Sequence, residues 1–228
     1  MVLEVIATTA GDAKIAEKGG ADRIELITGI LEGGLTPSYG LIEEAVQAVA
    51  IPVNVMVRPH SQSFMYNEDD IRTMVKDIQI VKQIGAAGVV IGCLTEERQI
   101  DVETLKRLLD AAEGLDVTFH RAFDEAADQE KALEELLRFK QIKRILTSGG
   151  KKSVLDAQEQ MIKLVQKTEQ THLSIMAGSG LTIPALKRFI ETTRVKEVHF
   201  GTGVRFKQHA LEPVDAERVK KVKQILQG

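Results

Sequence analysis

Ionisable side chains interrupt several short apolar runs of this chain. Successive side chains of an extended strand point to opposite faces, so the all-apolar face of each run should meet a covering layer of helices. In the run 53–57 valine takes every second position, which leaves Arg58 on the opposite, inward face. The same alternation predicts that five ionisable groups converge on one interior: Glu4, Glu25, Arg58, His120 and His199. Burying an unpaired charge costs several kcal/mol, so these groups must pair with one another or with a ligand.

The residues around two of these groups indicate which chemistry the cluster could perform. Pro59 ends its run directly after Arg58 and directs the guanidinium to the open end of the interior. Arg121 and Asp124 follow His120 and add a second cation and a carboxylate. We interpret the set as an acid/base cluster with an arginine clamp for an anionic substrate. Its predicted catalytic residues are Glu4, Glu25, Arg58, His120, Arg121, Asp124 and His199. The alternative is a structural network of salt bridges.

Three glycine-rich segments follow the last three apolar runs. Glycine lets backbone N–H groups approach a ligand closely, and the neighbouring hydroxyls add donors, so such segments can hold a phosphate group. The predicted anion-binding residues are Ser148, Gly149, Gly178, Gly180, Gly201 and Gly203. The alternative is that these glycines serve only tight turns.

Metal ligands are sparse in the sequence. The five histidines show no HxH or HExxH spacing, and Cys93 is the only cysteine, so no closed zinc site is expected. A soft Cu(I) site could combine Cys93 with Met56 or Met176. Cys93 is therefore a weak metal candidate, and its alternative role is that of a small buried apolar residue.

The element pattern explains how these residues would be brought together. Eight apolar runs recur about every 30 residues, each followed by an amphipathic segment of helix length, which predicts a (β/α)8 TIM barrel. The runs are 3–8, 23–27, 53–57, 88–91, 117–120, 144–147, 173–177 and 197–200. With 228 residues the chain has room for a single domain, residues 1–228, and its slightly short length allows for one helix lost or shortened around 28–38. The long segments 28–38 and 59–67 are predicted to form flaps over the barrel mouth, or else ordinary surface loops.

Composition excludes several classes of partner. The net charge is −3 and Lys and Arg are interspersed with acids, so no basic stripe for nucleic acid is present. No apolar stretch approaches the ~20 residues of a membrane span, and the first apolar run leaves no space for a signal peptide. We therefore expect a cytoplasmic protein without nucleic-acid or membrane partners, and a lone cysteine fits a reducing compartment.

Several segments resemble the CutC family, whose members are named copper homeostasis proteins. These segments are GGADRIEL (19–26), LEGGLTPSYGLI (31–42), RP (58–59), VTFHRAFD (117–124) and RILTSGG (144–150), and the similarity covers nearly the whole chain. The resemblance implies a cytoplasmic barrel that forms a homo-oligomer, with a dimer favoured, and that takes part in copper handling. Several relatives have a cysteine where this chain has Ile27, which weakens a copper site built on that thiol.

Two functional hypotheses follow from the sequence. The first is a copper-handling or copper-binding protein, with copper implied by the resemblance alone. The second is an enzyme of the lyase or isomerase type that acts on a small phosphorylated or carboxylated metabolite at the barrel mouth. In the second, the glycine segments hold the anion, the two arginines stabilise negative charge, and Glu25 or His120 moves protons.

Overall fold

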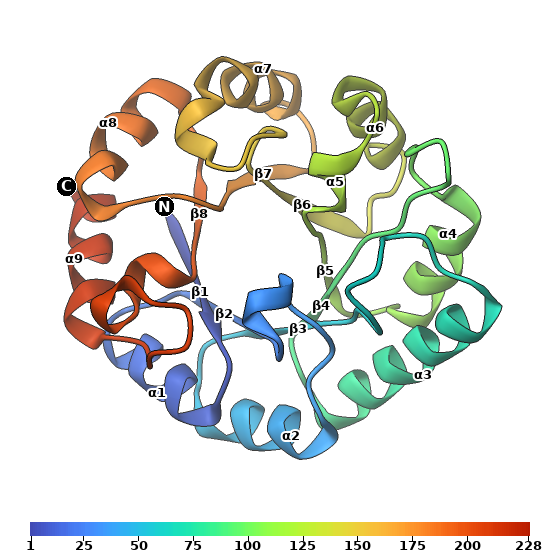
Figure 1. Cartoon of the computed structure of the whole chain (residues 1–228), viewed down its shortest axis with the longest axis horizontal. Helices are drawn as coiled ribbons and strands as arrows, with labels where there is room; N and C mark the ends of the chain where they lie inside the picture. The colour runs from blue at the N-terminus through green and yellow to red at the C-terminus, as the bar shows by residue number, and fades with distance from the viewer.

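The computed structural model describes residues 1–228 and has eight parallel strands that close into a barrel in chain order (Figure 1). This is the predicted (β/α)8 architecture. The strands are β1 (Val2–Ala7), β2 (Arg23–Leu26), β3 (Val53–Met56), β4 (Gly88–Ile91), β5 (Asp116–Phe119), β6 (Ile142–Thr147), β7 (Ser174–Ala177) and β8 (Glu197–Phe200). Figure 1 views the barrel from the end where the strands finish, which is the end where enzymes of this architecture carry their sites.

Every strand is followed by an α-helix that packs on the outside of the barrel (Figure 1). The helices are α1 (Ala10–Lys18), α2 (Tyr39–Ala48), α3 (Glu68–Ile84), α4 (Val102–Ala111), α5 (Ala122–Glu125), α6 (Gln129–Leu136), α7 (Gln158–Thr168), α8 (Ile183–Thr193) and α9 (Ala216–Gln227). Short 3₁₀ turns lie between some strands and helices: η1 (Ile30–Glu32), η2 (Val154–Asp156), η3 (Thr202–Val204) and η4 (Phe206–Gln208). No helix is lost around 28–38, because the ten-residue α2 follows that segment.

Local sequence signals account for the helix starts. Asn67 begins α3 with a capping box, in which its side chain accepts from the backbone N–H of Asp70 while the Asp70 carboxylate accepts from the N–H of Asn67. The side chain of Ser38 caps α2. These caps fix where the preceding loops end, so the segments 28–38 and 59–67 are held at both ends above the barrel.

The apolar core lies between the strands and the helices and forms one cluster of buried side chains. The lower barrel interior is instead filled by ion pairs. Arg23 contacts Glu4 at 2.5 Å and Glu197 at 2.6 Å, and Arg144 contacts Glu197 at 3.2 Å and Asp116 at 2.6 Å. We call these five residues the charged floor. It fixes Glu4 below the open end of the barrel.

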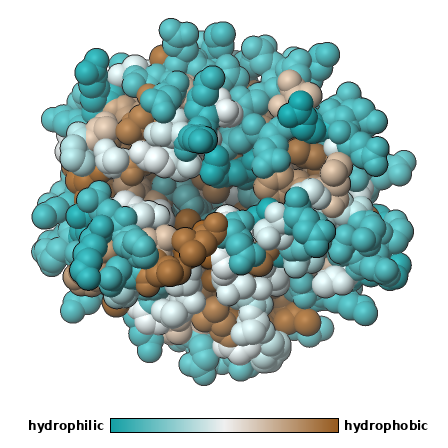
Figure 2. All heavy atoms as spheres, viewed as in Figure 1, coloured by the Kyte–Doolittle hydropathy of each residue, from teal (hydrophilic) through white to brown (hydrophobic).

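The outer surface is largely hydrophilic on the face where the strands end (Figure 2). None of the helices combines the length and apolar character that crossing a membrane requires. Figure 2, drawn from the same side as Figure 1, shows a largely hydrophilic face with a hollow near its centre and apolar atoms beside that hollow. The hollow is the entrance to the cavity described next.

Candidate functional site

A cavity of about 590 Å³ opens at the carboxyl ends of the strands. Its wall includes Glu25 of β2, Met56 of β3 and His199 of β8, together with residues of the loops that follow these strands. Ile30 and Glu32 of the segment 28–38 contribute to the wall as well. A cavity of this size accommodates a small metabolite.

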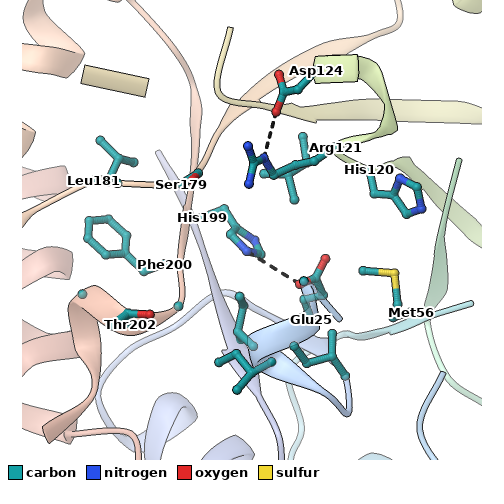
Figure 3. Close-up of a pocket in the computed structure, with 18 of the residues that line it drawn as sticks. Glu25, Met56, His120, Arg121, Asp124, Ser179, Leu181, His199, Phe200 and Thr202 are labelled. Carbon is teal, nitrogen blue, oxygen red and sulfur yellow. Dashed lines mark hydrogen bonds and ion pairs between the residues drawn. The ribbon is translucent and has the colours of Figure 1, made fainter. Parts of the chain in front are cut away.

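A row of three buried groups forms the reactive part of this cavity. His199 Nδ1 lies 2.8 Å from Glu4 Oε1, and His199 Nε2 lies 3.6 Å from Glu25 Oε2. Glu4 is fully buried on the charged floor, so it lies beneath the cavity rather than on its wall. Figure 3 shows the His199 ring and the Glu25 carboxylate facing each other. A carboxylate at Nδ1 fixes the ring orientation and leaves Nε2 for chemistry.

Burial and neighbouring charges give the three groups different acidities. Burial raises the pKa of Glu25 to about 7, although the facing His199 opposes this rise. Burial alone would also raise the pKa of Glu4, but Arg23 and His199 lower it to about 2. For His199, burial lowers the pKa, but the two carboxylates outweigh burial and raise it above its ordinary value. Glu25 therefore changes its charge near neutral pH while Glu4 stays ionised.

Arg58 is directed mainly toward the segment 28–38. Its Nη1 donates to the carbonyl oxygens of Glu32 at 3.0 Å and Gly34 at 3.3 Å, and its guanidinium carbon lies 4.5 Å from the centre of the Phe64 ring. The arginine thus joins the segments 28–38 and 59–67 at the cavity wall. Two of its hydrogen bonds go to the protein, but Arg58 also lies on the cavity wall and its buried Nε has no partner, so its role as an anion clamp stays a prediction.

His120 also lies apart from the Glu25–His199 pair. Its Nδ1 accepts a hydrogen bond from the backbone N–H of Ala122 at 3.1 Å, and its ring packs against Phe64. Figure 3 shows the His120 ring turned away from Glu25. Burial lowers the pKa of His120 to about 3, and the charge of Arg58 adds to this effect. The predicted cluster of five groups is therefore divided in two, and His120 is a neutral group on the cavity wall.

The carboxylate of Asp124, a residue of α5, takes the place of a bound anion in the loop after β6. Its carboxylate accepts from the backbone N–H groups of Ser148 and Gly150 at 3.0 Å and from the Thr147 hydroxyl at 2.5 Å. Gly149 N–H is also taken, because it donates to the Thr147 hydroxyl oxygen at 2.9 Å. Ser148 and Gly149 lie outside the cavity wall, so the structure separates them from Gly180, Gly201 and Gly203, which belong to it.

Arg121 remains at the mouth beside this loop. Its Nε donates to Asp124 at 2.8 Å and its Nη2 donates to the Ser148 hydroxyl at 3.0 Å. The side chain is 42 % exposed, and Figure 3 shows its guanidinium extending over the cavity toward Ser179. Its Nη1 makes no hydrogen bond within the protein, so one edge of the guanidinium is available to a ligand.

The loops after β7 and β8 line the cavity together. Gly180, Gly201 and Gly203 belong to its wall, and so do their neighbours Ser179 and Thr202. Gly178 does not: its N–H donates to the Thr147 carbonyl at 3.0 Å, and a Cβ there would lie 2.5 Å from the Leu146 side chain. Ser179, a residue that our sequence analysis did not select, has a φ of 68° in the left-handed region. Such a conformation in a non-glycine residue is often found at functional sites.

Comparison with known proteins identifies the family. The model of the CutC family matches residues 1–204. A CutC family protein of Pasteurella multocida is 39% identical over 209 residues, covering 91% of this chain and 85% of that protein. A human protein named copper homeostasis protein cutC homolog is 41% identical over 198 residues, covering 87% and 72%. The chain belongs to the CutC family.

A solved CutC structure supports the assignment. The crystal structure of the CutC protein from Streptococcus agalactiae superposes on this chain with a TM-score of 0.82 at 32% identity, covering 87% of this chain and 97% of that one. The resemblance noted in the sequence and the TIM-barrel fold are thus both confirmed.

The three candidate sulfur ligands for copper lie in different places in this CutC chain. Cys93 is fully buried in the apolar core, its Sγ donates to the carbonyl oxygen of Asp101 at 3.4 Å, and burial raises the pKa of its thiol. Met56 lies on the cavity wall, whereas Met176 lies on the floor and accepts a hydrogen bond from Arg23. Cu(I) requires several soft ligands at one point, and these three sulfur atoms belong to three separate environments. The residues do not form a Cu(I) site within one chain.

Proposed function

We propose that this CutC-family chain binds a small phosphorylated or carboxylated molecule in the barrel-mouth cavity and transfers a proton on it. The observation that carries the proposal is that the Glu25–His199 pair and the loops after β7 and β8 open into the same cavity. An acid/base group and a place for an anion are then within one ligand's length of each other.

The anion would be held by the two loops and Arg121. The backbone N–H groups of Ser179, Gly180 and Gly201 make no hydrogen bond within the protein, so they can donate to a ligand. Barrel enzymes frequently bind phosphate between the loops after strands 7 and 8, next to a short extra helix, and η3 provides such a turn here. The free edge of Arg121 would add a positive charge from the opposite side.

Glu25 is the group best suited to proton transfer. Its pKa of about 7 makes both the acid and the base form available at neutral pH. His199, which Glu4 orients, would stabilise the ionised form of Glu25 and would accept the proton from it or return the proton to it. This chemistry is that of a lyase or an isomerase. His120, which the sequence offered as an alternative proton carrier, is less suited because burial keeps it neutral.

A part in copper homeostasis enters the proposal through the names of relatives such as the human protein. We propose that the chain contributes to copper homeostasis in the cytoplasm through its small-molecule chemistry rather than by holding Cu(I) tightly. The ligand positions described above support this choice, because Cys93 is enclosed in the core. Assembly as a homodimer, which the family resemblance implies, remains part of the proposal.

Thermal unfolding with added anions tests the binding step. A ligand at ten times its Kd stabilises the native state by about 1.4 kcal/mol, which raises the Tm of a chain of this length by about 3–6 °C. Inorganic phosphate and a panel of sugar phosphates and hydroxy acids serve as probes. We expect at least one to raise the Tm in a concentration-dependent manner.

Two substitutions at the exposed Thr202 localise the effect. Thr202→Glu places a negative charge beside the loop N–H groups and should abolish the Tm increase, whereas the neutral Thr202→Gln should retain it. An increase that is unchanged in Thr202→Glu, or no increase with any probe, would contradict the proposal. Substitution of Gly178 is unsuitable, because any Cβ there collides with Leu146.

A further inference from the structure

The Glu25–His199 pair has lone pairs that the protein itself leaves unused. Glu25 is 2 % exposed, and its Oε1 has no hydrogen-bond partner although it is buried. The 3.6 Å between Glu25 Oε2 and His199 Nε2 is too long for a hydrogen bond. A buried carboxylate oxygen without a donor costs free energy, so its persistence points to a ligand that contacts it.

The charges around the pair favour a cation as that ligand. The charged floor contains three carboxylates, those of Glu4, Glu197 and Asp116, and two guanidinium groups that pair with them. Glu25 adds a further carboxylate directly above this floor. Counting Glu25, the set has four carboxylates and two arginines, and the ion-pair partner within 4.0 Å of Glu25 is His199.

The distances fit a transition-metal ion. His199 directs Nδ1 to Glu4, so its Nε2 is the atom free to bind a metal, and a carboxylate at the other ring nitrogen is the usual orienting partner of a metal-bound histidine. Two ligand atoms that lie 3.6 Å apart, each about 2.1 Å from an ion, subtend an angle of about 120° at it. The ligand atoms of Glu4, Glu25 and His199 all lie within 4.8 Å of one another. An ion bound by both oxygens of the Glu25 carboxylate would also give Oε1 the partner that it lacks, and water or ligand oxygens from the cavity could complete the coordination.

We infer that Glu25 and His199 form a binding site for a divalent transition-metal ion, with Glu4 as the residue that orients His199. One carboxylate and one imidazole suit Zn²⁺ or another borderline divalent ion, in contrast to the soft ligands that Cu(I) requires. The ion takes the lone pairs that the proposed proton transfer needs, so metal binding and proton transfer exclude each other. This last consequence rests on the proposed function, whereas the metal site itself does not.

Metal binding can be measured on the full chain without any substrate. Chelator-treated protein is titrated with Zn²⁺ alone by calorimetry, and with Cu²⁺ alone by electron paramagnetic resonance. We expect one ion per chain and, in the Cu²⁺ spectrum, hyperfine coupling from a single imidazole nitrogen. Glu25→Gln, which preserves shape, should weaken binding at least tenfold, and His199→Gln should remove the nitrogen coupling.

Glu125→Gln is the matched control, because Glu125 is an exposed carboxylate on the wall of the same cavity. It should bind the ion as the unmodified chain does. An ion held equally well by Glu25→Gln, or no binding by folded protein at millimolar metal, would overturn the inference. If His199→Gln does not fold, Glu25→Gln and the spectrum of the unmodified chain decide the question. Failure of the proposed function would be recognised separately, as anions that leave the Tm unchanged while Zn²⁺ still binds.

Discussion

Removing the buried charge of Glu25 should stabilise the protein at alkaline pH. Burial raises the pKa of this carboxyl from 4.5 to about 7, which corresponds to about 3 kcal/mol because each pH unit is worth about 1.4 kcal/mol. Below pH 4 Glu25 is protonated in both the folded and the unfolded chain. Between pH 4.5 and 7 the unfolded chain releases the proton while the folded chain keeps it, so stability falls as pH rises. Above pH 8 the folded chain has lost the full amount of stability, about 3 kcal/mol.

Glu25→Gln preserves the shape of the side chain and carries no charge at any pH. Its free energy of unfolding should equal that of the unmodified chain below pH 4 and exceed it by up to about 3 kcal/mol at pH 8. His199 loses a facing carboxylate in this variant, which reduces the gain. Urea unfolding followed by far-ultraviolet circular dichroism measures both chains, with Glu125→Gln as the control for loss of a carboxylate. A variant that is less stable at pH 8, or a difference that does not change with pH, would show that Glu25 is a structural salt-bridge partner.

Three further predictions concern the groups around the cavity. Asp124→Ala should lower the free energy of unfolding by about 3 kcal/mol, because it leaves the N–H groups of Ser148 and Gly150 without their acceptor. A loss below about 1 kcal/mol in urea unfolding would be inconsistent with this role. Arg58→Ala should increase proteolytic cleavage within 28–38, since it removes the hydrogen bonds to that segment, and an unchanged cleavage rate would refute the link. The Cys93 thiol should react with a disulfide reagent only on unfolding, and Cys93→Ser should leave the Cu(I) affinity unchanged in a chelator competition. Rapid reaction of the folded chain, or one tightly held Cu(I) ion that is lost in Cys93→Ser, would contradict the structure.

The sequence predicts the barrel and the inward face of its strands, because both depend on local periodicity. Alternation with a period of two placed Glu25 and His199 on the interior without knowledge of their partners. Applied to the strand beginnings, the same alternation would have found Arg23, which lies two residues before Glu25, and Glu197, two residues before His199. Apart from Glu4, the members of the charged floor were therefore missed, although the signal for Arg23 and Glu197 was present.

Pairing between distant positions could not be obtained in this way. Glu4 and His199 are separated by 195 positions, and nothing local indicates that they meet. The direction of the Arg58 side chain depends on carbonyl oxygens of a loop whose conformation the sequence does not specify. Likewise, Asp124 follows β5, and its carboxylate accepts hydrogen bonds from the N–H groups of the glycine-rich loop after β6. The protein therefore supplies its own anion to a loop whose sequence is typical of anion binding.

The most direct test of the proposed function is to identify the small molecule that the native protein carries. Mass spectrometry of the supernatant after denaturation would detect it, with Thr202→Glu and Thr202→Gln purified in parallel. The proposal predicts a phosphorylated or carboxylated molecule in stoichiometric amount from the unmodified chain and Thr202→Gln, and its loss from Thr202→Glu. Stoichiometric copper that disappears in Cys93→Ser, with no organic anion released, would contradict it.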